Sequence, residues 1–218
     1  DSKVVQFKPE DVEDSTIKSI DRRAKILIFN LSNNKSILIH LKMTGQLVYV
    51  TPTVRFGAGH PNDSLVATLP DRSTRVTITF DDGSTLYFND QRKFGWVRLL
   101  PTIEIPNIDF MKKVGPEPLE ADFTAEAFAD RFRRRARTNI KAALLDQTVV
   151  AGVGNIYADE ALWGAKVHPQ RLVSSLSVDD FAGIYTELRE VMNLSIEKGG
   201  SSNQNYVNAE GKRGSYMD

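Results

Sequence analysis

The sequence comprises 218 residues, of which 41% are hydrophobic, a length and composition sufficient for one large or two small globular domains. The 28 basic and 28 acidic residues balance to a formal charge of zero, so the total charge neither favours nor excludes a polyanionic partner. The absence of cysteine excludes disulfide bonds and thiolate metal sites, and the three histidines lack the spacing of metal ligands, so no metal is expected in this chain.

The first half of the chain has strand-like patterns. Residues 25–31 and 36–43 alternate around the turn sequence SNNK, and residues 75–80 and 85–90 alternate around DDGS, which predicts two β-hairpins. The segment 49–73, which contains proline, glycine and asparagine, is expected to be a long irregular connection between them. This half is therefore expected to form an antiparallel β-sandwich or a barrel-like layer.

A proline-containing segment separates this half from the rest of the chain. It is marked by four prolines, Pro101, Pro106, Pro116 and Pro118, which interrupt helices and strands alike. We expect a β-sandwich domain at residues 1–105, a linker at 106–122 and a helical domain at 123–218.

The second half has helical periodicity. Four helices are expected, at residues 124–136, 139–147, 155–165 and 177–200. Thr124 and Asn155 are suitable N-caps, Ser177 and Asp180 have the spacing of a capping box, and Gly199 is a suitable stop. The predicted fold class is α+β, an N-terminal antiparallel β-sandwich followed by an all-α domain.

A basic segment precedes a glycine-containing turn in this helical half. The segment RFRRRARTNIK supplies Arg131, Arg133, Arg134, Arg135, Arg137 and Lys141. In the turn TVVAGVG that follows, glycines allow close approach to free N–H groups at the start of the next helix, and Asn155 adds an amide donor. The alternatives are a solvated helix face and an αα-hairpin whose glycines allow close packing. Because the basic segment directly precedes the glycine-containing turn, an anion site for a nucleic-acid backbone is favoured.

The residues around this turn resemble a known family. The sequence IKAALLDQTVVAGVGNIYADEALWGAKVHPQR is similar to the helix-two-turn-helix segment of the formamidopyrimidine-DNA glycosylase and endonuclease VIII family of bacterial base-excision repair. The segments IKSIDRRAKILIFNL, ILIHLKMTGQL, FNDQRKFGWVRL, VGPEPL and IEKGGSSNQNYVNAEGKRGSYM resemble further motifs in the family's order. The resemblance covers nearly the whole chain.

The resemblance implies a set of residues that bind DNA phosphates. Lys25 and Asn155, with Gly154 beside it, are expected to bind the phosphates that flank a flipped nucleotide, and Lys141 to position the same backbone. Without the resemblance, Lys25 reads as an ordinary lysine at the edge of a strand.

The resemblance also implies three residues that fill the void left by an extruded base, namely Met43, Arg92 and Phe94. Extrusion costs a few kcal/mol of stacking and pairing, which an apolar wedge and a guanidinium facing the orphaned base both offset. The alternative is core packing for Met43 and Phe94 and a solvated charge for Arg92.

The segment from 199 to 216 resembles the family's base-covering loop, in which Ser201, Ser202, Tyr206 and Tyr216 are expected to face the lesion. As bare sequence it is only a polar, glycine-rich stretch.

The sequence departs from the family at both ends. The family's N-terminal proline, whose amine attacks the sugar C1′ carbon, and the glutamate next to it are not in this sequence, so its catalytic residues are unknown. The family's four-cysteine zinc finger is not in it either, and zinc is expected only if the full protein has such a finger. The α-amine of Asp1, or an amine of Lys25 or Lys42, is a candidate for residual Schiff-base chemistry. The chain is a piece of an ordinary glycosylase or a naturally shortened relative, and we favour the first because the break falls inside a domain.

The expected function is that of a DNA-repair glycosylase and AP lyase that flips oxidised bases of the formamidopyrimidine or 8-oxoguanine type from duplex DNA. The alternative is a non-catalytic module that binds damaged or abasic DNA with the same contacts. An RNA-binding protein is disfavoured by the motifs HLKMTG and DQRKFG. We expect a monomer, located in the cytoplasm with the nucleoid, because the sequence has neither a membrane span nor a signal peptide.

Overall fold

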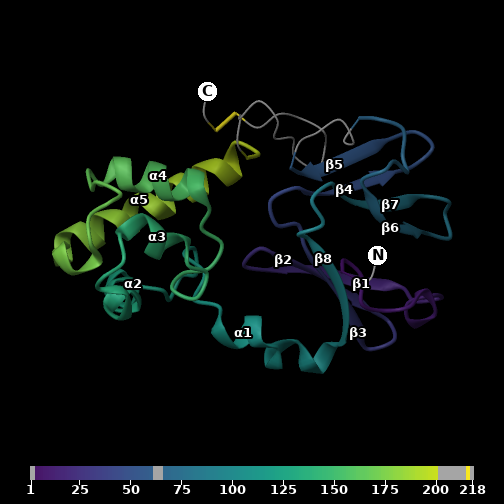
Figure 1. Cartoon of the computed structure of the whole chain (residues 1–218), viewed down its shortest axis with the longest axis horizontal. Coiled ribbons are helices and arrows are strands. Elements are labelled where there is room, and N and C mark those ends of the chain that lie inside the picture. Colours follow the sequence, from purple (N-terminus) through teal and green to yellow (C-terminus); the bar gives the residue numbers. More distant parts are fainter. Residues whose placement is uncertain (1–2, 61–65, 201–214, 217–218) are drawn as a thin grey trace. The chain divides into compact units, whose positions relative to one another are not determined.

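The computed structural model describes residues 3–60, 66–200 and 215–216 (Figure 1). The chain divides into two compact units, one formed by Asp1–Ile105 with Glu197–Asp218 and the other by Pro106–Ile196. The second unit begins where the linker was expected to begin. Among the described residues, 197–200 and 215–216 group with the first unit.

The first unit contains two four-stranded antiparallel sheets (Figure 1). In the order of pairing, one sheet consists of β1 (Ile17–Arg23), β2 (Ile26–Leu31), β3 (Lys35–His40) and β8 (Trp96–Pro101). The other consists of β5 (Arg55–Gly59), β4 (Gly45–Val50), β7 (Thr85–Asp90) and β6 (Thr74–Thr79). A short 3-10 helix, η1 (Pro9–Asp11), precedes β1. The predicted antiparallel β-sandwich is confirmed.

Alternating side chains from both sheets build one core. Phe29 on β2 and Ile37 and Ile39 on β3 belong to the same cluster of buried residues as Phe88 on β7. Successive residues of a strand point to opposite faces, so the hydrophobic alternation seen in the sequence becomes the buried face of each hairpin. Both predicted hairpins, β2–β3 and β6–β7, are confirmed.

The expected irregular connection at 49–73 is wrong in part. It contains the end of β4 and all of β5, whose sequence RFGAG has no alternating pattern. Gly57 and Gly59 of β5 pair with Val48 and Gln46 of β4, so long-range pairing rather than propensity makes this strand. Gly59 has φ +116°, and a Cβ atom there would collide with the carbonyl oxygen of Gly45.

The segment that was expected to break helix and strand also contains helices. A 3-10 helix, η3 (Thr102–Asn107), accommodates Pro106, and α1 (Asp109–Lys113) follows it. Pro106 has no N–H to donate, so it forfeits one i→i+3 hydrogen bond within this short helix.

The second unit is helical, as predicted. Besides α1, it contains α2 (Ala125–Phe132), α3 (Ile140–Leu145), α4 (Asn155–Gly164) and α5 (Val178–Glu197) (Figure 1). Two short 3-10 helices, η4 (Arg133–Arg135) and η5 (Val173–Ser175), lie between them. Its core is built from fully buried side chains of α2, α3, α4 and α5, including Phe128, Leu144, Leu162 and Leu188. None of the helices within the described ranges combines the length and apolar composition needed to cross a bilayer.

Most of the predicted caps are confirmed. The Thr124 hydroxyl accepts a hydrogen bond from the Ala127 N–H at 3.2 Å. The Ser177 N–H donates to the Asp180 carboxylate at 2.8 Å, and the Asp180 N–H donates to the Ser177 hydroxyl at 3.1 Å, as a capping box requires. The prediction for Asn155 is wrong by one residue, because Gly154 is the N-cap of α4 and Asn155 is its first helical residue.

Candidate nucleic-acid interface

In the first unit, the buried carboxylate of Asp90 binds both the β3–β4 loop and the β7–β8 loop. Asp90, at the end of β7, has no exposed surface. It accepts hydrogen bonds from the hydroxyl of Thr44 in the β3–β4 loop and from the backbone N–H groups of Arg92 (3.1 Å) and Gly95 (2.7 Å) in the β7–β8 loop. Gly95 leaves room for this, because a Cβ atom there would lie 2.8 Å from the Phe88 ring and 2.9 Å from the His40 carbonyl oxygen.

The three predicted void-filling residues lie on these two loops. Met43 precedes Thr44 and is 61% exposed, and Phe94 precedes Gly95 and is 52% exposed. The guanidinium of Arg92 lies over the Phe94 ring, 4.5 Å from its centroid. Such exposure rules out core packing for Met43 and Phe94. Large exposed apolar side chains on loops held by hydrogen bonds are typical of a contact surface.

A basic group of residues lies in and beside the β3–β4 loop and consists of Lys25, His40 and Lys42. Burial, together with the positive charges of Lys42 and Lys25, lowers the pKa of His40 to about 4. Although Lys25 reaches the surface, partial desolvation and the charge of Lys42 lower its pKa as well. Neutral His40 accepts a hydrogen bond at Nδ1 from the Lys42 N–H at 3.0 Å, which fixes the start of the loop.

The lowered pKa of His40 predicts acid sensitivity. The unfolded histidine has a pKa near 6.5, so between pH 6.5 and about 4 the unfolded state binds a proton that the folded state excludes. The free energy of unfolding therefore has its full value above pH 6.5. It falls by about 3 kcal/mol as the pH falls to 4. Urea unfolding at pH 7 and pH 4.5 should show a smaller loss for His40→Gln than for wild type. His60→Gln, at an exposed histidine, should keep the wild-type loss, and equal losses in all three proteins would contradict the prediction.

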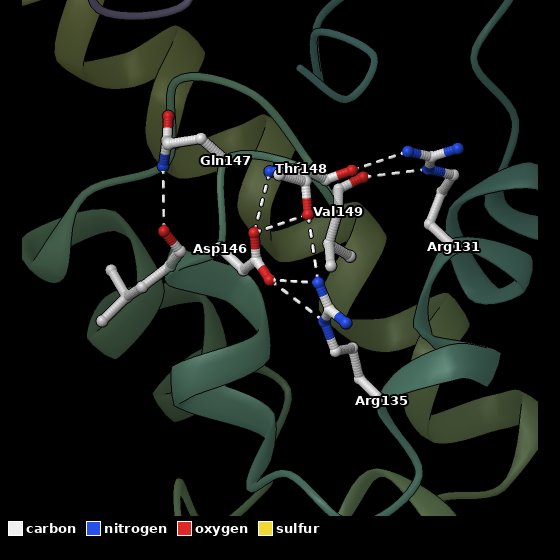
Figure 2. A network of polar contacts seen from close by, with 7 residues as sticks. Arg131, Arg135, Asp146, Gln147, Thr148 and Val149 are labelled. Carbon is white, nitrogen blue, oxygen red and sulfur yellow. Dashed lines mark hydrogen bonds and ion pairs between the residues drawn. The ribbon is translucent and has the colours of Figure 1, made fainter. Parts of the chain in front are cut away.

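In the second unit, two polar residues shape the turn between α3 and α4. Gln147 donates from its side-chain amide to the carbonyl oxygens of Leu145 and Val153, both at 3.0 Å, and accepts from the Gly152 N–H at 2.9 Å. Asp146 accepts from the N–H and hydroxyl of Thr148 at 2.9 and 2.7 Å (Figure 2). The turn is therefore held by side chains within it as well as by the helices.

Part of the basic segment serves this turn. Figure 2 shows Arg131 and Arg135 pointing toward residues 146–149 from α2 and η4. Arg131 donates to the carbonyl oxygens of Val149 (3.1 Å) and Thr148 (2.6 Å). Both Arg135 Nε and Nη2 donate to the Asp146 carboxylate, at 3.0 and 2.6 Å. These two arginines of the basic segment therefore stabilise the protein's own turn.

The start of α4 brings the remaining predicted residues together. Gly154 caps the helix without a side chain, and Asn155 exposes its amide at the first helical position. Lys141 on α3 forms an ion pair with Asp159, one helical turn beyond Asn155, with Nζ 2.8 and 2.9 Å from the two carboxylate oxygens. Lys141, Gly154 and Asn155 therefore form one group in this unit, whereas Lys25, Met43, Arg92 and Phe94 belong to the first unit.

The predicted loop residues fall mostly beyond what the structure describes. Ser201, Ser202 and Tyr206 lie outside the described residues, as does Asp1. Tyr216 is described, and its N–H donates to the Gly200 carbonyl oxygen at 3.3 Å. Within the described ranges, no group of three or more histidine, aspartate and glutamate side chains is arranged to hold a metal ion.

Sequence reasoning missed the residues that hold the loops in place. Asp90 and Gln147 bind mainly backbone groups, and Arg131 and Arg135 were assigned with their neighbours by charge alone. The available signal for Asp90 was its place at the end of the predicted strand 85–90, two residues before Arg92, in the sequence FNDQRKFG.

Comparison with known proteins identifies matches to both units. The family model for the formamidopyrimidine-DNA glycosylase N-terminal domain matches residues 2–97, and the model for the H2TH domain of the same glycosylase matches residues 114–206. The chain is 41% identical over 201 residues to a formamidopyrimidine-DNA glycosylase of Desulforamulus reducens, a match that covers 92% of this chain and 67% of that protein. It is 39% identical over 209 residues to a protein of that name from Streptococcus mutans, covering 95% of this chain and 70% of the other.

The chain is also similar to solved structures of proteins bound to DNA. The complex between Lactococcus lactis Fpg and DNA containing an abasic site matches with a TM-score of 0.79 and 32% identity, over 94% of this chain and 70% of that chain. The complex of Lactococcus lactis Fpg with DNA containing Fapy-dG matches with a TM-score of 0.75 and 32% identity, over 88% of this chain and 67% of the other. The chain thus spans about two thirds of the length of these proteins.

Proposed function

Because this chain belongs to the formamidopyrimidine-DNA glycosylase family and is a DNA glycosylase of base-excision repair, we propose that it acts on duplex DNA carrying an oxidised base of the formamidopyrimidine or 8-oxoguanine type, or an abasic site. The observation that carries this proposal is the exposure of Met43 and Phe94 on two loops held by buried Asp90. The non-catalytic alternative is not favoured, since relatives about 40% identical over most of the chain are glycosylases by name.

In this proposal the two loops replace an extruded nucleotide. Phe94 and Met43 enter the void and restore part of the lost stacking, which lowers the cost of flipping the base. Arg92 faces the orphaned base of the opposite strand, where a planar guanidinium can donate two parallel hydrogen bonds. Its cation–π contact with Phe94 at 4.5 Å orders the long side chain before DNA binds.

A second set of residues binds the backbone. We assign Lys25 in the first unit and Lys141, Gly154 and Asn155 in the second unit to phosphate contacts. The start of a ten-residue helix supplies backbone N–H groups and the positive end of its dipole, and the lysines supply charge. These contacts position the duplex without reading its sequence. We further propose that the protein acts as a monomer in the bacterial cytoplasm, associated with the nucleoid.

Asn155→Ala tests the phosphate assignment. It is expected to weaken binding about tenfold on abasic and undamaged duplexes alike, because a hydrogen bond to a charged phosphate is lost in both. The melting temperature should change little, since the side chain is exposed and does not cap the helix. Mobility-shift titrations with Asn193→Ala, an exposed asparagine of α5, as the matched control measure this effect. A large fall in melting temperature with unchanged binding would return the residue to a structural role.

A further inference from the structure

The ion pair between Lys141 and Asp159 faces the proposed phosphate site. Asp159 follows Asn155 by four residues on α4, so both side chains lie on one face of the helix, about 6 Å apart along its axis. Lys141 Nζ lies 2.8 and 2.9 Å from the two oxygens of the Asp159 carboxylate. The Asp159 carboxylate is therefore paired with the Lys141 ammonium group, which the proposed function assigns to a DNA phosphate.

This pair is poorly placed to be a mainly stabilising contact. The side chains of Lys141 and Asp159 are 33% and 50% exposed, and ion pairs this accessible to solvent contribute little to folding stability. A negative charge on the face of α4 that receives phosphate also repels DNA. Its position is thus better explained by an effect on Lys141 than by an effect on stability.

We propose that Asp159 is a positioning residue that holds Lys141 beside the start of α4 and competes with DNA phosphate for its ammonium group. The inference rests on the proposed function, in which Lys141 contacts the DNA backbone. When DNA binds, phosphate takes over hydrogen bonds from the carboxylate, so part of the gain from the new contact is offset by the lost ion pair. Because this contact is independent of sequence, the competition keeps affinity for all DNA lower than the lysine alone would give.

The test is Asp159→Asn in the complete chain, with Glu190→Gln, an exposed residue in the middle of α5, as a control with the same change of charge. Asp159→Asn is expected to bind undamaged duplex about three- to tenfold more tightly than Glu190→Gln at low salt. The slope of log affinity against log salt should become steeper by up to about 0.9. In the wild-type protein the released Asp159 carboxylate takes up a cation, which offsets the cation that Lys141 displaces from phosphate. A purely structural role would change the melting temperature and leave the slope unchanged.

The double variant Lys141→Ala/Asp159→Asn separates competition from simple repulsion. If Asp159 acts through Lys141, the gain from Asp159→Asn should fall to that of the Glu190→Gln control when Lys141 is absent. An undiminished gain, or no gain in the single variant, would overturn the inference while leaving lesion binding intact. Wild-type protein that binds neither abasic nor undamaged duplex would instead contradict the proposed function itself.

Discussion

Asp90→Ala is expected to destabilise the protein by about 3–5 kcal/mol and to abolish its preference for damaged DNA. The substitution removes a buried carboxylate and leaves the Thr44 hydroxyl and the N–H groups of Arg92 and Gly95 without their acceptor. Each orphaned donor costs about 1–3 kcal/mol unless water reaches it. Both loops then lose their fixed geometry, so their apolar tips no longer meet the void in one orientation.

Urea unfolding and binding at a temperature where the variant is folded measure the two effects separately. Asp81→Ala, at an exposed aspartate in the turn before β7, is the matched control and should change stability by less than about 0.5 kcal/mol. Asp90→Asn should lie between the two, because an amide can still accept but presents N–H groups toward one of the donors. An Asp90→Ala protein as stable and as selective as Asp81→Ala would show that the carboxylate does not organise the loops.

Phe94→Ala is expected to weaken binding to an abasic duplex about 10- to 30-fold and binding to undamaged duplex less than about threefold. Only the abasic duplex offers a permanent void, and stacking of an aromatic ring against a base contributes about 1–3 kcal/mol. The melting temperature should fall little, because Phe94 is already 52% exposed in the folded protein.

Competition titrations with both duplexes measure this discrimination. Ile20→Ala provides the control, as its side chain is 59% exposed on β1 in the same unit and has no proposed contact with DNA. Equal losses of affinity for the two duplexes would show that Phe94 does not fill the void. A large loss of stability would indicate a packing role.

The sequence predicts those elements whose pattern is local. The β2–β3 and β6–β7 hairpins follow from alternation around short turns, and the capping box of Ser177 and Asp180 follows from spacing. Strand β5 has no such pattern, since RFGAG is extended only because β4 pairs with it. Local periodicity therefore predicts the helices and hairpins but does not predict a glycine-rich edge strand.

The candidate site divides in the same way. The motifs identify Met43, Arg92 and Phe94, and their exposure agrees with a contact surface. What holds them is a bond between residues 46 positions apart, Thr44 and Asp90, which no local pattern indicates. Composition likewise could not separate Arg131 and Arg135, which bind the protein's own turn, from arginines that remain at the surface.

The most direct test of the account is the equilibrium affinity of the wild-type chain for a duplex with a single abasic-site analogue and for the same duplex undamaged, each titrated with salt. We predict at least about tenfold tighter binding to the abasic duplex, because only that duplex accepts Met43 and Phe94 without the cost of extruding a base. We also predict a log–log salt slope of about −0.9 or steeper on both, since Lys25 neutralises a phosphate and Asp159 partly offsets the contribution of Lys141. Equal affinity for the two duplexes, with a slope near zero, would contradict both the wedge and the phosphate contacts.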